Sequence, residues 1–126
     1  MKQQNERPHK RLDLWKKAIE MVARIYEVTK EFPKEEIYGL TSQLRRAAVS
    51  VPSNIAEGLT RRSVAEKLHF LNISQGSCSE IDTQAEIALK LGFLTEERFD
   101  MLEEHLVHVQ RLLGGITRSI KATKST

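Results

Sequence analysis

Two short runs of the sequence carry side chains that bind metal ions in helical proteins. Glu66 and His69 lie three residues apart, which is the Glu-x-x-His step of di-iron helical bundles. His105 and His108 have the same spacing, but no glutamate occupies the first position of that step. A di-iron site needs two such steps and two further inward-facing glutamates. We therefore expect neither a metal ion nor another cofactor.

Cys78 is the only cysteine of the chain, and its thiolate would be a strong nucleophile. Apolar residues repeat around it at helical spacing, so Cys78 lies on an apolar stripe, which is typical of a small core residue. The sequence has no glycine-rich phosphate loop and no Gly-x-Ser-x-Gly elbow. These observations predict a protein that is not an enzyme.

The same sequence predicts a cytoplasmic location and no membrane partner. One cysteine cannot form an intrachain disulfide, which suits a reducing compartment. The first twelve residues are polar and charged, unlike a secretory signal. No apolar run approaches the roughly 20 residues that span a membrane.

Asn54, Glu57 and Arg61 have the spacing of neighbours on one side of a helix. At 100° per residue they fall within about 60° of one another, and Glu57 precedes Arg61 in the favourable order of an ion pair. We interpret them as a structural polar network with Ser77 and Glu80, because polar groups beside a core must be paired. Loss of Glu57 is then expected to cost about 1–3 kcal/mol. The alternative is that these residues line a functional pocket.

Basic residues occur in adjacent pairs and near both ends of the chain. Residues 1–12 carry a net charge of +3 and residues 111–126 carry +4, which leaves −4 for the segment between them. Basic ends bind nucleic acid by displacing counterions from phosphates, or they only keep the protein soluble. Because no aromatic residues alternate with them, we expect backbone-directed binding with little sequence preference. The candidate contacts are Lys10, Arg11, Lys16, Lys17, Arg45, Arg46, Arg61, Arg62, Arg118 and Lys121.

The elements that must position these residues are helices. Apolar residues at spacings of three and four predict four helices, over about 13–31, 39–60, 64–91 and 95–120. Ser63-Val64-Ala65-Glu66 is a capping box, Gly92 suits a left-handed cap, and Thr95 suits an N-cap. Pro52 should kink the second helix.

The predicted fold is all-α, an antiparallel up-down four-helix bundle. The chain has only 6% aromatic residues, which suits an aliphatic helical core. We expect a flexible basic arm over residues 1–11, the bundle over residues 12–120, and a basic C-terminal tail over residues 121–126.

The third helix has more apolar surface than one bundle needs, because its apolar arc covers about 200°. One apolar stripe is expected to face the bundle core, and a second stripe to face a partner chain. The candidate interface residues are Phe70, Ile73, Ile81, Ala88 and Leu91. Gly76-Ser77 is expected to let another helix approach closely. The alternative is a monomer that buries this helix at its centre.

A longer motif resembles a known family. The run Val51-Pro52-Ser53-Asn54-Ile55-Ala56-Glu57-Gly58, with Arg61, Gly76-Ser77 and Glu80, is similar to proteins encoded in intervening sequences of bacterial 23S ribosomal RNA genes. The resemblance extends from about residue 14 to residue 120. It implies an antiparallel four-helix bundle that assembles into a ring, commonly a pentamer. A more distant relative is the accessory variability determinant protein of diversity-generating retroelements, which implies association with RNA or a reverse transcriptase.

These observations favour a non-enzymatic homo-oligomeric adaptor, a pentamer by the resemblance. Its partners are expected to be further copies of itself, together with RNA, DNA or a nucleic-acid enzyme such as a reverse transcriptase. The alternative is a purely structural or protein-interaction oligomer with no role in nucleic-acid binding.

Overall fold

The structure is a computed structural model that describes residue 9 and residues 12–124. Its elements are α1 (Asp13–Thr29), the short 3-10 helix η3 (Lys34–Glu36), α2 (Leu40–Leu59), α3 (Val64–Lys90) and α4 (Glu96–Lys124). The described part of the chain is therefore all-helical and has no β-strand. None of its helices is long and apolar enough to cross a membrane.

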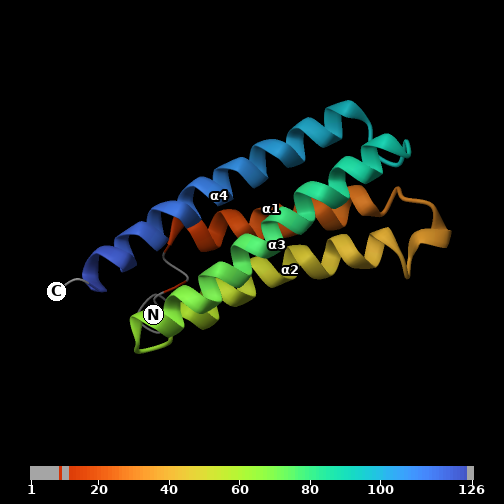
Figure 1. Cartoon of the computed structure of the whole chain (residues 1–126). Coiled ribbons are helices and arrows are strands. Elements are labelled where there is room, and N and C mark those ends of the chain that lie inside the picture. Colours follow the sequence, from red (N-terminus) through yellow and green to blue (C-terminus); the bar gives the residue numbers. More distant parts are fainter. Residues whose placement is uncertain (1–8, 10–11, 125–126) are drawn as a thin grey trace, which may run out of the picture.

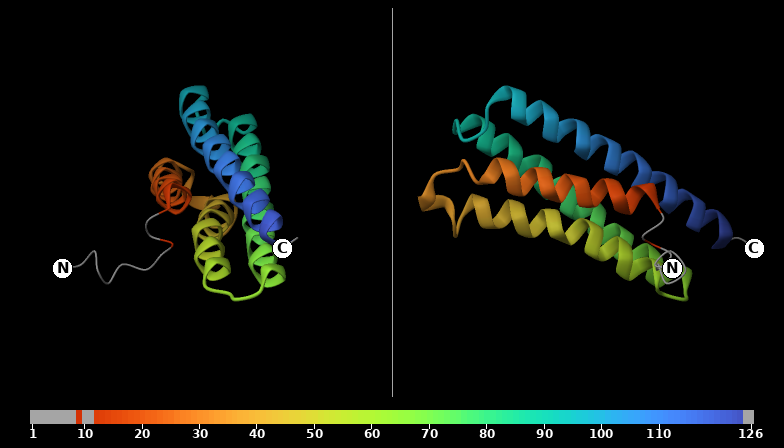
Figure 2. Two further views of the ribbon diagram at one scale, coloured as in Figure 1. Left: turned by 90° about the vertical axis from the view of Figure 1, so that its left-hand side faces the viewer. Right: turned by 180° about the vertical axis from the view of Figure 1, so that it is seen from behind.

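The four long helices lie side by side, and the chain reverses direction at each connection (Figure 1). Each helix contacts two others, because α1 and α3 both pack against α2 and α4. The view along the bundle in Figure 2 shows α1 and α3 on opposite sides. One end of the bundle therefore gathers the start of α1, the α2–α3 corner and the end of α4.

The helix ends follow the local signals of the sequence. Ser63 Oγ accepts a hydrogen bond of 3.1 Å from the Glu66 N–H, which confirms Ser63 as the N-cap of α3. Thr95 Oγ1 accepts a hydrogen bond of 3.2 Å from the Arg98 N–H. Gly92 has a φ of +80°, which confirms its left-handed conformation at the end of α3. α4 continues to Lys124, four residues past the predicted end of the bundle.

The buried face of α3 differs from the prediction that one apolar stripe faces the core and the other faces a partner chain. Ile81 is 1% exposed and Ala88 is 0% exposed, so both lie in the core of a single chain and cannot contact a partner. Ile73 and Leu91 are exposed, and Phe70 is half-buried. The physical reason is that the middle of the 200° arc faces the other helices, which leaves the edges of both stripes outside.

The close approach expected at Gly76-Ser77 involves Ser77 but not Gly76, because Ser77 is buried and its Oγ donates a hydrogen bond of 2.8 Å to Ser50 Oγ of α2. The glycine at which α2 and α3 pack closely is Gly58. Gly76 is exposed, and a Cβ added there would have no atom of the described chain within 4 Å. Gly58 is buried, and a Cβ added there would lie 3.1 Å from Phe70 Cβ and 3.2 Å from the Lys67 carbonyl oxygen. The glycine of the family-like motif therefore lets α2 and α3 pack closely at this end of the bundle.

Candidate nucleic-acid interface

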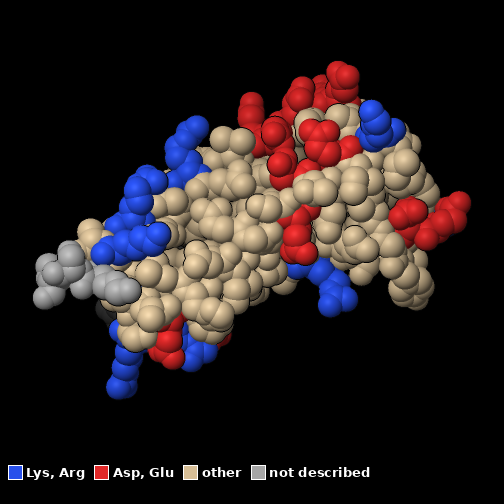
Figure 3. Space-filling view, viewed as in Figure 1, with Lys and Arg blue, Asp and Glu red and all other residues tan. Residues whose placement is uncertain are grey.

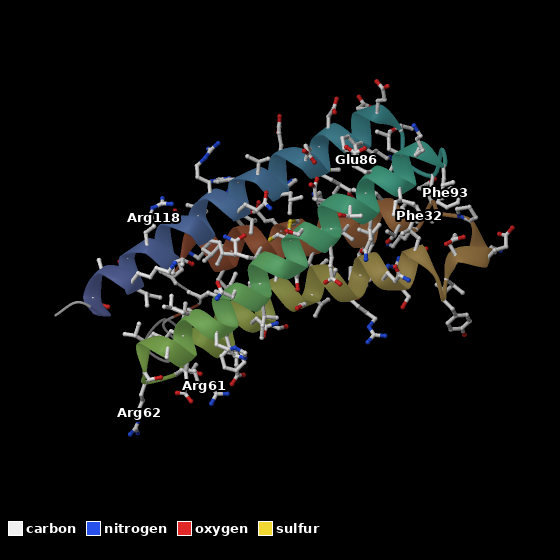
Figure 4. All side chains as sticks on the ribbon, viewed as in Figure 1. Phe32, Arg61, Arg62, Glu86, Phe93 and Arg118 are labelled. Atoms are coloured by element: carbon white, nitrogen blue, oxygen red, sulfur yellow. The ribbon has the colours of Figure 1, made fainter. Side chains whose placement is uncertain are left out.

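Charge is distributed unevenly along the bundle. In Figure 3, lysine and arginine lie mainly toward one end of the visible face, and most aspartate and glutamate lie toward the other. α4 shows this division by itself, because its first half carries Glu96, Glu97 and Asp100, and its second half carries Arg118 and Lys121. Figure 4 places Arg61, Arg62 and Arg118 at one end and Glu86 near the other. We call the first of these ends the basic end.

The basic end contains six of the ten predicted contacts, namely Lys16, Lys17, Arg61, Arg62, Arg118 and Lys121. Lys16, Arg62, Arg118 and Lys121 are exposed, and Lys17 Nζ lies 3.8 Å from the Glu20 carboxylate. Lys10 and Arg11 lie outside the described residues. The structure thus brings together basic side chains that are more than 100 residues apart in the sequence.

Arg61 is held by contacts within the chain. Its guanidinium pairs with Glu57 and lies 4.8 Å from the centre of the Phe70 ring. Its backbone carbonyl accepts a hydrogen bond of 2.6 Å from Lys67 Nζ. Arg61 therefore fastens the end of α2 to the start of α3, while its neighbour Arg62 extends into solvent.

Arg45 also has a structural role, which differs from its predicted role as a nucleic-acid contact. Its Nε donates a hydrogen bond of 2.8 Å to the hydroxyl of buried Thr29, and its Nη2 donates one of 3.3 Å to the Tyr26 carbonyl. The guanidinium also lies 4.6 Å from the centre of the Tyr26 ring. A cation is favourable here because Tyr26 and Thr29 belong to the C-terminal turn of α1.

We expect Arg45→Ala to lower the free energy of unfolding by about 1–2 kcal/mol, because it removes two charge-assisted hydrogen bonds and a ring contact. The neighbouring Arg46→Ala is the control, and it is expected to change stability by less than about 0.5 kcal/mol. Arg46 is exposed and makes no hydrogen bond or ion pair with any described residue. Urea unfolding would compare the two variants, and equal midpoints would contradict a structural role for Arg45.

The predicted polar network is two separate groups. Asn54 Nδ2 donates hydrogen bonds to the carbonyl and the hydroxyl of Ser50, at 2.9 and 3.0 Å. Ser77 Oγ in turn donates to Ser50 Oγ at 2.8 Å, which links α3 to α2. Ser50 is thus the centre of this group, although it was not among the residues predicted from the sequence. Its position four residues before Asn54 is the signal that could have identified it.

The second group is the pair of Glu57 and Arg61, with side chains 47% and 39% exposed. Exposed ion pairs typically contribute only about 0.2–1 kcal/mol to the free energy of unfolding. We therefore expect the loss of Glu57 to be less destabilising than the sequence predicted. Glu80 joins neither group, because it forms no hydrogen bond or ion pair within the described chain. It lines a groove between α2 and α3 instead.

An apolar groove of about 380 Å³ lies between α1 and α2. Its apolar lining comes from Trp15, Ile19, Val22, Val49, Pro52 and Ala56. Ile19 and Val49 remain exposed within one chain. This α1–α2 groove is a second apolar surface, in addition to the exposed edge of α3, and it was not predicted from the sequence.

Two side chains of the described chain, Glu103 and Cys78, have a clearly raised pKa. Burial raises the pKa of Glu103, and Asp82, Glu86 and Asp100 raise it further. In the part of the chain that is described, no set of three or more His, Cys, Asp or Glu side chains could hold a metal ion. Burial also raises the pKa of Cys78 to about 12, so its thiol is protonated at neutral pH.

Comparison with known proteins agrees with this architecture. The family model of the 23S rRNA-intervening sequence protein matches residues 10–115. A crystal structure of a protein of unknown function from the S23 ribosomal protein family of Bacteroides thetaiotaomicron matches with a TM-score of 0.77 at 22% sequence identity. The match covers 82% of this chain and 97% of that chain, and it shows a shared fold. No curated protein matches.

Proposed function

The chain belongs to the 23S rRNA-intervening sequence protein family, and from its charge distribution we propose that it is a non-enzymatic, self-associating adaptor that holds nucleic acid at its basic end. The observation that carries this proposal is the gathering of basic side chains from α1, the α2–α3 corner and α4 at one end of the bundle (Figure 3). Clustered Lys and Arg bind the phosphate backbone, whatever the base sequence.

Self-association is supported by two different apolar surfaces at the same level of the bundle. The α1–α2 groove contains Val49 and Pro52. On α3, half-buried Phe70 and exposed Ile73 are level with α2 residues 51–58, because Gly58 packs on Phe70 and Val51 accepts a hydrogen bond from Ser74. We place the groove of one copy against Phe70 and Ile73 of the next.

Contacts between two unlike surfaces generate rings when the rotation closes. Since both surfaces lie at one level, copies in such a ring would stand side by side with their axes in the same direction. All basic ends would then lie on one rim of the ring. A pentamer agrees with the family resemblance, and the rim would multiply the weak phosphate contacts of each copy.

We expect single-stranded RNA to bind with a steep dependence on salt between about 50 and 200 mM. The variant Arg62→Gln/Arg118→Gln/Lys121→Gln should weaken binding by about tenfold or more at low salt. It should also make the slope of log K against log salt roughly two units shallower, since each lost phosphate contact contributes about 0.7. Mobility shifts across a salt series would measure both effects.

The control is Lys30→Gln/Lys34→Gln/Lys90→Gln, which removes the same charge from exposed positions near the other end. It should retain both the affinity and the slope of the unchanged protein. Equal losses in the two variants would show that net charge, and not the basic end, determines binding. No mobility shift of the unchanged protein at low salt would leave the alternative, a structural oligomer without a nucleic-acid partner.

The partner in a cell would be RNA, DNA or an enzyme that acts on them, such as a reverse transcriptase. A cytoplasmic location forms part of this proposal, because that compartment supplies such partners.

A further inference from the structure

We propose that the groove between α2 and α3 binds one unpaired guanine nucleotide of a bound RNA strand. This inference rests on the proposed function and adds a base preference to it. The groove has a volume of about 520 Å³, which is within the usual range for small-ligand sites. Its lining includes an aromatic ring, a cation and two hydrogen-bond acceptors, provided by Tyr38, Arg46, Glu80 and Gln84.

Tyr38 offers a surface on which a base could stack. It follows η3 directly before α2, and it is 93% exposed. No described residue forms a ring contact with it. Proteins recognise unpaired RNA bases by stacking them on exposed aromatic rings in this way. No aromatic residue alternates with the basic pairs in the sequence, whereas the folded chain places Tyr38 and Arg46 on one groove.

Arg46 is the cation of the groove. Its guanidinium is exposed and makes no hydrogen bond or ion pair with any described residue, in contrast to Arg45. Guanidinium groups bind phosphate oxygens with two parallel N–H donors. A nucleotide whose base stacks on Tyr38 could therefore place its phosphate against Arg46.

The acceptors of the groove favour guanine among the four bases. Glu80 has a carboxylate, which only accepts hydrogen bonds when ionised, and it has no partner within the described chain. Gln84 also lines the groove, and within the described chain its Oε1 is shielded from solvent and has no hydrogen-bond partner. Guanine presents N1–H and N2–H₂ donors on one edge, whereas the other bases present fewer adjacent donors. Once the Gln84 amide turns toward the groove, such a base would give its oxygen the missing hydrogen-bond partner.

Ser50 also lines the groove. Ser50 Oγ accepts the hydrogen bond from Ser77 at 2.8 Å, so these two hydroxyls join α2 to α3 beside the groove. The groove is lined by α2 residues between positions 42 and 50 and opens toward α3, whereas the α2 residues of the proposed subunit contact lie between positions 49 and 56 and line the groove with α1. A strand held at the basic end and a base held in the groove would thus use separate parts of the bundle.

The test uses short fluorescent oligouridine RNAs with one central guanosine, adenosine or inosine, measured by anisotropy at low salt. The unchanged protein should bind the guanosine RNA about tenfold more tightly than the adenosine RNA. Inosine should bind with intermediate affinity, because it retains N1–H and lacks the N2 amino group. Glu80→Gln should abolish this preference while binding of the adenosine RNA is retained.

Tyr38→Ala should weaken binding of all three RNAs by about tenfold, because it removes stacking. Glu86→Gln is the control for Glu80→Gln, since Glu86 is an exposed carboxylate of the same helix outside the groove (Figure 4). It should keep the guanosine preference. Light scattering and a thermal midpoint should show that each variant keeps the mass and the fold of the unchanged protein.

Three results would overturn the proposal. Equal affinity of the unchanged protein for the three RNAs would exclude a base site, although salt-dependent binding would leave the proposed function intact. Absence of RNA binding at any salt concentration would remove both. A change of oligomer mass in Tyr38→Ala or Glu80→Gln would show that the groove is a contact between subunits or with another protein segment.

Discussion

Gly58→Leu is expected to lower the free energy of unfolding by about 3 kcal/mol, since a larger side chain has no space between α2 and α3. Even a Cβ at this position would lie 3.1 Å from Phe70 Cβ and 3.2 Å from a backbone oxygen of α3. Neither atom lies at the end of a flexible side chain, so the two helices would have to separate. Urea unfolding at fixed protein concentration would measure the loss.

A matched pair of alanine variants separates this contact from helix propensity. Gly58→Ala and Gly76→Ala both replace a glycine inside a helix, and each gains about 0.8–1 kcal/mol in propensity. Gly76→Ala should show this gain, because a Cβ there meets no atom of the described residues within 4 Å. Gly58→Ala should not, because the close contact offsets it. Equal stabilisation by the two changes would contradict the tight packing at Gly58.

The sequence predicted the features that depend on neighbouring residues. Ser63 and Glu66 form the cap of α3 because both lie in one turn of chain, and Gly92 ends α3 because its φ needs no other element. The number of helices and the family were predicted for the same reason, since the apolar spacing and the motif are continuous in the sequence.

The orientation of α3 could not be predicted in this way. Periodicity gives the width of an apolar arc, but it does not tell which part of the arc faces the core. Ile81 and Ala88 were expected at a subunit contact, and the structure buries them against the other helices of the same chain. Their position depends on how α2 and α4 pack on α3, which the sequence of α3 alone does not contain.

The roles of the basic residues show the same limit. Arg45 and Arg46 are adjacent and chemically identical, but they lie on different sides of α2. Arg45 reaches Thr29 of α1, whereas Arg46 lines the groove toward α3. The sequence identified both as basic and correctly placed them on a helix. Only the packing of α1 and α3 distinguishes a structural arginine from one that is free to bind.

Two single substitutions, one on each proposed contact surface, are expected to dissociate the oligomer and so to test whether it is a ring. The unchanged protein should form a homo-oligomer, near 72 kDa for five copies of the 14.4 kDa chain. Val49→Glu places a charge in the α1–α2 groove, and Ile73→Glu places one on the opposing surface of α3. Each variant alone should become a monomer, because burying an unpaired carboxylate in an apolar contact is unfavourable.

Mixing the two monomeric variants should restore one contact. The Ile73→Glu chain keeps an intact groove, and the Val49→Glu chain keeps an intact α3 surface, so together they should form a dimer of about twice 14.4 kDa.

Val107→Glu is the control, because Val107 on α4 is 43% exposed, close to the 41% of Val49, and lies on neither surface. Its mass should equal that of the unchanged protein in light scattering. If Ile73→Glu left the oligomer intact while Val49→Glu dissociated it, the groove would pair with another surface, such as the groove of a second copy. A 14.4 kDa monomer for the unchanged protein at micromolar concentration would exclude the ring.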